Sequence, residues 1–454
     1  MSDLIKELQD ALGADAVVSG AALAERATSY WDSSPMQARA LLRPHSTEAV
    51  SQAMHLCHKH GQSVVTHGGL TGVVSGTVTT PDDVIMSLER MTTIESIDEA
   101  GGTAVIQAGV ILQNAQEAMA EQGFLFPLDF GARGSCTIGG AVSTNAGGIN
   151  VLRYGMMRNQ LLGLEAVLAD GTVISSLNQM LKNNTGYDLK QLFVGSEGTL
   201  GIVTRVVVRL FPLPTSRQTA MVALESFDSV ISLLRRLQAD LAGTLCAYEV
   251  MWNNYFHHVT AEGHHRAPLD RDYSFYVLLE AEGADAAADE ERFDRLLEQA
   301  FEDGLIVDAV LPKSETERTA FWDIREVFDS CLPAYLYDVS LPIRDMAVFV
   351  ERLESAMRDR WPNVVCNVFG HIADGNLHLF FNPNREGDLH AECDVIVYGC
   401  LDEFEGSVSA EHGIGIDKRQ WLQNSRSTEE IALMRSLKQV LDPGNLLNPG
   451  KIFE

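Results

Sequence analysis

The sequence has few cations and no long apolar run, and both scarcities exclude classes of protein. Lys and Arg number 34 against 62 Asp and Glu, which gives a formal net charge of −28. A surface this acidic repels nucleic acid and anionic lipid. No stretch approaches the roughly 20 apolar residues of a membrane-spanning helix. We therefore expect no nucleic-acid partner and no integral membrane segment, and an anionic substrate needs a local cationic site.

Cysteine is also sparse. Seven cysteines are scattered along the chain without a CxxC pair, which supports neither a disulfide framework nor iron–sulfur ligation. The N-terminal segment MSDLIKELQDALG is acidic and amphipathic, whereas a secretory signal has a basic start followed by an apolar run. These features predict reduced thiols in a cytoplasmic protein.

The length and the order of the elements predict an α+β fold of two domains. A chain of 454 residues is too long for one compact core. We expect short helices in 1–35, a first domain over 36–215, and a second domain over 216–426. In the second, strands alternate with long charged helices. A last helix leads into a C-terminal segment over 427–454.

Several local patterns predict individual elements. A capped helix is expected from Thr47 to about His60, and a hairpin is expected to turn at Asp170–Gly171. Four longer helices of the second domain are expected at about 228–242, 286–303, 314–330 and 345–361.

Glycine and small residues concentrate in three segments, 68–76, 131–148 and 195–201. Glycine lets backbone N–H groups approach an anion closely, and successive N–H groups can cradle phosphate. The chain has neither a GxGxxG after a strand nor a GxxxxGK[ST] motif, so a Rossmann or P-loop site is not expected. Each segment alone could be an ordinary turn. Three in one domain favour a large phosphate-bearing ligand.

The motifs THGGLTGVVSG, PLDFGARGSCTIGGAVSTNAGG, NTGYDLKQLFVGSEGTLGIVT and the terminal NPGK resemble the FAD-linked oxidoreductases of the vanillyl-alcohol-oxidase fold. Within that group the chain resembles the D-lactate and D-2-hydroxyglutarate dehydrogenases, over nearly its whole length. The resemblance implies a two-part FAD-binding domain, an α+β cap domain that carries the substrate site, and a C-terminal segment that returns to the flavin.

The same resemblance implies contacts with each part of FAD. The pyrophosphate would be bound by Gly68, Gly69, Thr71 and Gly72. The flavin and its ribityl chain would be lined by Gly134, Ser135, Ile138, Gly139, Gly140, Asn145, Gly147 and Gly148. The adenosine half would be held by Glu197, Gly198, Gly201 and Ile202, and the isoalloxazine end by Asn448 and Lys451. Some relatives attach FAD through a histidine directly after the paired glycines. Here that residue is Leu70, and His67 precedes the pair, so we expect non-covalent FAD.

A second group of chemically capable residues lies in NVFGHIADGNLHLFF. His371 and His378 flank the turn Asp374–Gly375–Asn376, and a hairpin of this size can place them opposite each other, with Cβ atoms roughly 5 Å apart. Two facing imidazoles form half a site for zinc or manganese, although lone histidines are more often surface or satisfied core residues. The resemblance assigns His371, His378 and Glu411 as ligands of a divalent metal and His412 as the base.

Arg325 matches an arginine that the family uses to bind a substrate carboxylate, although helix packing or an i,i+4 pair with Asp329 would also explain it. Asp329, Leu336 and Phe380 stand where the 2-hydroxyglutarate pattern has threonine, lysine and asparagine. A second substrate carboxylate is therefore in doubt, and the pocket is expected to be more apolar or to suit a hydroxyl or amine tail. The histidines and arginine of 264–266 are alternative cations, or a solvated loop.

The implied reaction oxidises a small D-2-hydroxy acid. A metal-bound hydroxyl loses its proton to a histidine, and hydride passes to flavin N5. The sequence shows no nicotinamide site, so a quinone, an electron-transfer flavoprotein or a cytochrome would accept the electrons. The alternatives are a metal-dependent hydrolase, a flavin-binding electron-transfer or structural subunit, a same-fold oxidase, and an enzyme acting on another hydroxy or amino substrate. The sequence leaves open whether the chain forms a homodimer.

Overall fold

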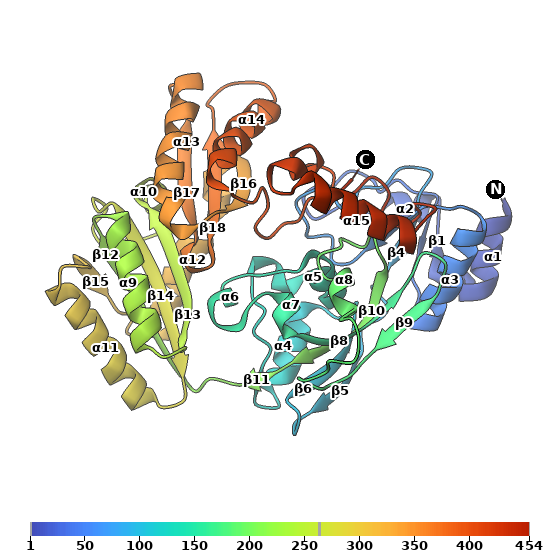
Figure 1. Cartoon of the computed structure of the whole chain (residues 1–454), viewed down its shortest axis with the longest axis horizontal. Coiled ribbons are helices and arrows are strands. Elements are labelled where there is room, and N and C mark those ends of the chain that lie inside the picture. Colours follow the sequence, from blue (N-terminus) through green and yellow to red (C-terminus); the bar gives the residue numbers. More distant parts are fainter. Residues whose placement is uncertain (1, 262–264, 454) are drawn as a thin grey trace. The chain divides into compact units, whose positions relative to one another are not determined.

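The computed structural model describes residues 2–261 and 265–453, except for the side chains of 2, 3, 328 and 329. The chain divides into two compact units (Figure 1). Unit 1 comprises Met1–Gly148, Gly155–Leu213 and Glu411–Glu454, and unit 2 comprises Ile149–Tyr154 and Pro214–Ala410. This division differs from the expected one in two places: a short internal segment belongs to unit 2, and the chain returns to unit 1 at Glu411 instead of about 427.

Unit 1 contains two larger sheets and a two-stranded ribbon. The first sheet has the order β1-β2-β4-β3, with β2, β4 and β3 parallel, and the second is antiparallel with the order β5-β6-β10-β8-β9. The strands are β1 (Val17–Val18), β2 (Ala40–Leu42), β3 (Val64–His67), β4 (Val84–Ser87), β5 (Ile94–Asp98), β6 (Thr103–Gln107), β7 (Phe124–Leu125), β8 (Leu161–Val167), β9 (Val173–Ser176), β10 (Ile202–Arg209) and β11 (Phe211–Pro212).

Unit 1 also contains helices, most of which share one apolar core with these sheets. They are α1 (Ser2–Leu12), α2 (Ala21–Ala24), α3 (Thr47–Lys59), α4 (Leu112–Ala120), α5 (Ile138–Thr144), α7 (Met157–Gln160), α8 (Lys190–Phe193) and α15 (Thr428–Leu441). The α3 helix begins where Ser46 Oγ accepts a hydrogen bond from the amide of Ala49 at 3.2 Å, which satisfies one of the free N–H groups of the first turn. This helix and the hairpin between β8 and β9 confirm the sequence prediction.

The second N-terminal helix, α2, spans only Ala21–Ala24. Beyond Ala24 the chain turns, because short polar side chains bond to the backbone and compete with helix formation. Ser29 Oγ accepts hydrogen bonds from the amides of Trp31 and Asp32 at 3.2 and 3.1 Å, and Asp32 Oδ1 accepts one from the amide of Ser34 at 2.9 Å.

Unit 2 is built on a seven-stranded antiparallel sheet with the order β15-β12-β14-β13-β17-β18-β16. Its strands are β12 (Ser216–Leu224), β13 (Leu245–Trp252), β14 (Phe275–Gly283), β15 (Asp308–Val310), β16 (Tyr335–Ser340), β17 (Val365–His371) and β18 (Asn376–Asn382). Its helices are α6 (Val151–Tyr154), α9 (Phe227–Asp240), α10 (Asn253–Val259), α11 (Ala286–Glu302), α12 (Glu315–Glu326), α13 (Met346–Arg360) and α14 (His390–Leu401). Mixed helix and sheet in both units confirm the α+β expectation.

The α6 segment belongs to unit 2 because it packs against β13. Arg153 Nη1 donates a hydrogen bond to the carbonyl oxygen of Glu282 at 2.8 Å, which ties α6 to β14 as well. A short helix without a distinctive pattern gives no signal of such a distant partner, so the sequence did not predict this exchange.

The two faces of the unit 2 sheet carry different side chains, because successive residues of a strand point to opposite sides. Tyr248 of β13 and Tyr337 of β16 face α9 and α14, where their hydroxyls donate to Val230 O and to Asp394 Oδ1, each at 2.7 Å. The opposite face carries Glu249 and is covered by α12, whose Arg325 contacts it. Within the described residues, no helix of either unit is long and apolar enough to cross a bilayer.

Candidate functional site

The first two glycine-rich segments meet in unit 1. A side chain on Gly69 would put its Cβ 2.1 Å from Ser135 O, and one on Gly68 would put it 2.6 Å from Thr137 Oγ1. Likewise, a Cβ on Gly139 would lie 2.7 Å from that of Ala108. These distances are far below van der Waals contact, so glycine is required for the backbones to approach. The loop after β3 and the start of α5 therefore form one surface built from main chain.

The C-terminal segment joins the third glycine-rich segment to β3 through Asn448. Its Oδ1 accepts a hydrogen bond from the amide of Thr66 at 2.8 Å, and its Nδ2 donates to Glu197 O at 2.5 Å. Lys451 Nζ donates to Val78 O at 2.8 Å, and burial lowers the pKa of this lysine. Segments 64–78, 195–201 and 448–451, which are far apart in sequence, are therefore neighbours in unit 1.

Glu197 has a different set of partners from the one expected for an adenosine contact. Its Oε1 accepts a hydrogen bond from the amide of Ile414 and its Oε2 from the amide of Gly415, both at 2.7 Å. Burial raises the pKa of Glu197, while the two amides and Lys418 act in the opposite direction. Both carboxylate oxygens of Glu197 therefore accept hydrogen bonds from the backbone, and these bonds connect the loop after Glu411 to the glycine-rich segment.

The other residues expected to contact FAD differ in how exposed they are and in whether a ligand could reach their side chains. Ile138 and Ile202 are fully buried in the core of unit 1, so only their main chain is available to a ligand. Asn145 adopts a left-handed conformation with φ of 53° and ends α5. The residues that are exposed or partly exposed are Gly68, Gly69, Thr71, Gly72, Gly134, Ser135, Gly140 and Asn145.

His67, next to the paired glycines, is a structural residue. It is buried, and its Nε2 lies 2.9 Å from Thr77 O. Burial lowers its pKa to about 4, so the ring is neutral near pH 7. Leu70 follows the glycines with φ of 57°, a conformation that non-glycine residues seldom adopt.

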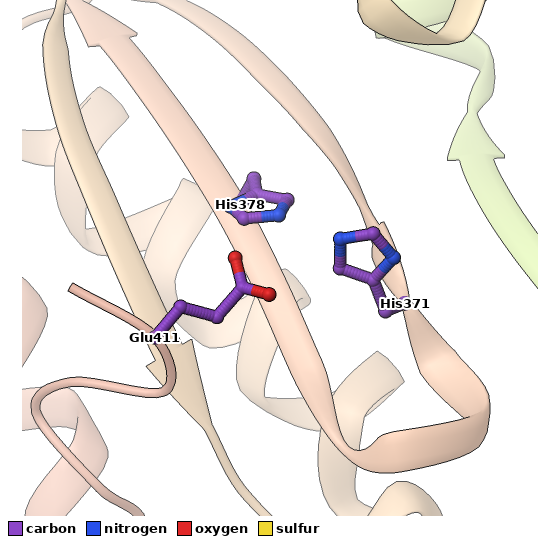
Figure 2. Close-up of side chains that lie close together, drawn as sticks. All are labelled: His371, His378 and Glu411. Atoms are coloured by element: carbon purple, nitrogen blue, oxygen red, sulfur yellow. The ribbon is translucent and has the colours of Figure 1, made fainter. Parts of the chain in front are cut away.

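His371, His378 and Glu411 each direct a possible metal-ligating atom into one small volume (Figure 2). Their ligand atoms all lie within 4.8 Å of one another. The two imidazole centroids are 5.3 Å apart, with an angle of 79° between the ring planes. Glu411 follows directly after Ala410, whose amide donates to Asp338 O of β16 at 3.4 Å. The three residues expected as metal ligands thus lie together, and their role as ligands stays a prediction.

The expected register of the two histidines was wrong. The residue directly opposite His378 is Phe369, whose ring lies 5.2 Å from the imidazole. His371 lies two residues further along β17, beyond the last β17–β18 pair. The turn of 372–375 contains a short helical segment before Gly375, and this extra length moves His371 to a diagonal position on the same face.

A buried glutamate that the sequence analysis did not identify connects the histidine to the arginine. Glu249 Oε1 lies 2.7 Å from His371 Nδ1, and Glu249 Oε2 accepts a hydrogen bond from Nε of Arg325 at 2.7 Å and forms an ion pair with its Nη2, also at 2.7 Å. Burial alone would raise the pKa of Glu249, but the charges and hydrogen bonds of His371 and Arg325 outweigh it and lower the pKa. A lone glutamate in the otherwise apolar strand LCAYEVMW was the available signal.

Arg325 is held in the sheet face by several contacts. Its guanidinium lies over the ring of Phe369, 4.5 Å from the centroid, and its Nη2 is 3.4 Å from His371 Nε2. Among the described residues, no hydrogen bond reaches its Nη1. The side chain of Asp329, the possible i,i+4 partner, lies outside the described residues. The whole of His264, one of the alternative cations, lies outside them as well. His412 is half-buried and adjoins Glu411 in the chain.

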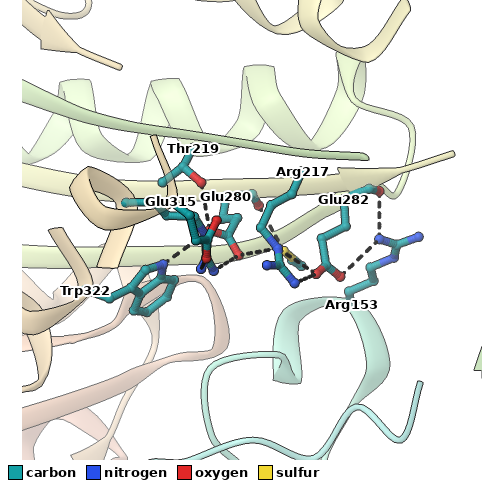
Figure 3. Close-up of polar contacts among 9 residues, drawn as sticks. Arg153, Arg217, Thr219, Glu280, Glu282, Glu315 and Trp322 are labelled. Carbon is teal, nitrogen blue, oxygen red and sulfur yellow. Dashed lines mark hydrogen bonds and ion pairs between the residues drawn. The ribbon is translucent and has the colours of Figure 1, made fainter. Parts of the chain in front are cut away.

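A second cluster of possible ligands on the same sheet face is an ion-pair network (Figure 3). Cys246, Glu280 and Glu282 lie within 4.8 Å of one another by their ligand atoms. Arg318 donates to both oxygens of Glu280 at 2.7 and 2.8 Å, and Arg217 Nη2 donates to Glu282 at 3.0 Å. These guanidinium groups already compensate the carboxylates, and they would repel a cation.

Comparisons with known proteins identify the family and support the fold. Residues 213–452 match the model for the C-terminal domain of FAD-linked oxidases, and 38–176 match an FAD-binding domain. The fold resembles a solved alkyldihydroxyacetonephosphate synthase at a TM-score of 0.76 and 16% identity, covering 99% of this chain and 84% of the other. This likeness supports the expected fold class.

Two curated relatives are similar over most of the chain. D-2-hydroxyglutarate dehydrogenase of Danio rerio is 38% identical over 90% of this chain and 78% of its own length. A putative D-lactate dehydrogenase of Schizosaccharomyces pombe is 38% identical over 90% of this chain and 81% of its own. Both are named mitochondrial, which contradicts the expectation of a cytoplasmic protein. With matches to both FAD-linked models, the chain belongs to the family of FAD-dependent dehydrogenases that contains these two relatives.

Proposed function

We propose that the protein is a metal-assisted dehydrogenase that oxidises a small D-2-hydroxy acid to its 2-oxo acid, with FAD as the hydride acceptor. The observation that carries this proposal is the group His371, His378 and Glu411 on one sheet face with the buried Arg325, in a member of an FAD-dependent dehydrogenase family.

The donor set suits a divalent cation such as zinc or manganese. Two imidazole nitrogens and one carboxylate oxygen leave a position open for substrate. The carboxylate of Glu249 at Nδ1 of His371 leaves Nε2 of that ring available as a ligand. When bound, the cation would lower the pKa of the substrate hydroxyl.

The main-chain surface of unit 1 suits FAD. Segments 68–72, 134–148 and 197–202 are brought together by glycine contacts and by Asn448, and their N–H groups can face the pyrophosphate. Bound FAD supplies a two-electron acceptor whose N5 takes the hydride. We expect the cofactor to be non-covalent, because Leu70 offers no nucleophile.

Arg325 and His412 would act on two groups attached to the reacting carbon, the carboxylate and the hydroxyl. Arg325 Nη1 would bind the substrate carboxylate, while Nε and Nη2 stay on Glu249. His412 accepts the hydroxyl proton. FAD, when bound, would take the C2 hydrogen as hydride, so that the C2–O bond would become a carbonyl and the 2-oxo acid would be released.

The far end of the substrate would meet an apolar surface. Leu336 of β16 and Phe380 of β18 are directly opposite each other, and both lie on the face that carries His378. We therefore favour a monocarboxylic acid with a short or apolar tail over a diacid. The electrons would leave the reduced flavin to a quinone, an electron-transfer flavoprotein or a cytochrome.

The deciding experiment is an anaerobic titration of the purified holoprotein with D-lactate, D-malate and D-2-hydroxyglutarate and with each L-enantiomer. The proposal expects the flavin absorbance to bleach with D-acids alone, and most readily with D-lactate. A flavin that no 2-hydroxy acid bleaches would overturn it. Peroxide formed in air at the turnover rate would instead indicate an oxidase.

A further inference from the structure

The face of the unit 2 sheet carries one carboxylate that contacts a proposed metal ligand and the proposed substrate anchor at once. Glu249 is 1% exposed, so its charge has no solvent to stabilise it. A buried carboxylate is tolerated when it is paired and hydrogen-bonded. Its two oxygens are used separately, Oε1 by His371 and Oε2 by Arg325. The three side chains therefore form one connected unit.

We propose that Glu249 is a positioning residue that sets the tautomer and orientation of His371 for metal binding and fixes the guanidinium of Arg325 for the substrate carboxylate. The inference rests on the metal site of the proposed function and adds a residue that touches neither metal nor substrate. A carboxylate at 2.7 Å from Nδ1 keeps the proton there, so the Nε2 lone pair remains for the cation.

Charge balance supports the same role. Arg325 Nη2 lies 3.4 Å from His371 Nε2, so a cation bound to Nε2 would stand close to a guanidinium. Two cations at such a distance in a buried site repel each other strongly. The single negative charge of Glu249 touches both groups and offsets that repulsion. Without it, metal binding and the position of Arg325 would oppose each other.

The backbone holds Glu249 in place, because its strand is paired on both sides. It pairs with His371 across β13 and β17 and with Leu278 across β13 and β14, so it sits in the middle of the sheet. Tyr255 donates through its hydroxyl to the carbonyls of Ile324 and Arg325, both at 3.1 Å, which fixes the end of α12 above it. The geometry is held from both sides.

The test compares Glu249→Gln with Glu280→Gln in the full-length holoprotein. Glu280 is a matched control, since it lies on the same face, is equally buried and receives two hydrogen bonds from one arginine. Zn²⁺ affinity is measured by competition with a chelating dye after metal removal, and FAD content and the melting temperature report the fold. The KM and kcat are measured with the acid that bleaches the flavin.

The proposal expects Glu249→Gln to weaken Zn²⁺ binding about 10- to 100-fold and to raise KM while FAD content stays the same. Glu280→Gln should change Zn²⁺ affinity less than about twofold, since it holds no ligand. Glu249→Asp keeps the charge and should recover part of the affinity; it is the variant to use if Glu249→Gln does not fold. Wild-type Zn²⁺ affinity in a Glu249 variant would overturn the proposal. Absence of Zn²⁺ or Mn²⁺ binding by the wild type would overturn the metal site as well.

Discussion

Leu336 of β16 lies directly across from Phe380 of β18, two positions along the pair from Asp338 and His378. The pair therefore presents apolar side chains on the face that carries His371 and His378. Leu336 is 44% exposed, so a longer polar side chain can be accommodated there.

Leu336→Lys should shift the preference toward diacids. A lysine at this position could form a charge-assisted hydrogen bond with a second carboxylate, which stabilises binding by about 1.5–3 kcal/mol. We expect kcat/KM for D-2-hydroxyglutarate relative to D-lactate to rise about tenfold or more. Val395→Lys, at an exposed position of α14, is the control for added surface charge. An unchanged ratio in Leu336→Lys would argue against the apolar pocket.

Removal of the metal should abolish turnover without loss of flavin. Chelation would empty the group formed by His371, His378 and Glu411, and added Zn²⁺ or Mn²⁺ should restore the rate. Steady-state turnover and the flavin spectrum are measured on the same sample. Glu282→Gln, in the arginine-paired cluster, should respond to the chelator as the wild type does. Turnover that persists after the metal has been removed, as checked by elemental analysis, would exclude the metal role.

His412→Ala should keep FAD and lose turnover. A positioned base contributes about 10²- to 10⁴-fold to a proton-transfer step, so kcat should fall within that range. Stopped-flow reduction of the flavin isolates the chemical step from reoxidation. His55→Ala, an exposed position on α3, serves as the control. A reduction rate equal to that of the wild type would remove the assignment of His412 as the base.

FAD should leave the protein when it is denatured. With Leu70 after the paired glycines and a buried, neutral His67 before them, we expect no covalent bond to the flavin. Acid precipitation should leave the yellow colour in the supernatant, and an intact mass spectrum of the denatured chain should show no added flavin. Colour that stays with the pellet would contradict this.

His67 should make stability depend on pH. Its pKa in the folded protein is about 4, below the ordinary value of 6.5, so the unfolded chain binds more protons between these values. The stabilisation is fully present above about pH 6.5 and is lost as pH falls toward 4, by about 3 kcal/mol in total. His67→Gln should reduce the drop in the free energy of unfolding over this range, and His55→Gln should not. An equal pH dependence of the free energy of unfolding in all three proteins would count against this role of His67.

The family, the α+β pattern and the longer helices of unit 2 could be predicted from the sequence. The helices expected at 228–242, 286–303 and 345–361 are present as α9, α11 and α13, with ends that differ by at most two residues. These features are readable because helical periodicity, caps and glycine segments are local properties of the chain. The expected helix over 314–330 ends at Glu326, and α14 was not predicted.

The contacts between residues far apart in the sequence could not be predicted and are seen only in the folded structure. Glu249 and His371 are 122 positions apart, and Glu197 and Ile414 are 217 apart. No local pattern specifies such pairs, because they depend on the order of strands in a sheet and on the packing of helices against it. A buried carboxylate must find donors within the fold. The pairing of β13 with β17 places His371 beside Glu249. The chain that returns to unit 1 after Ala410 provides two backbone amides that donate hydrogen bonds to Glu197.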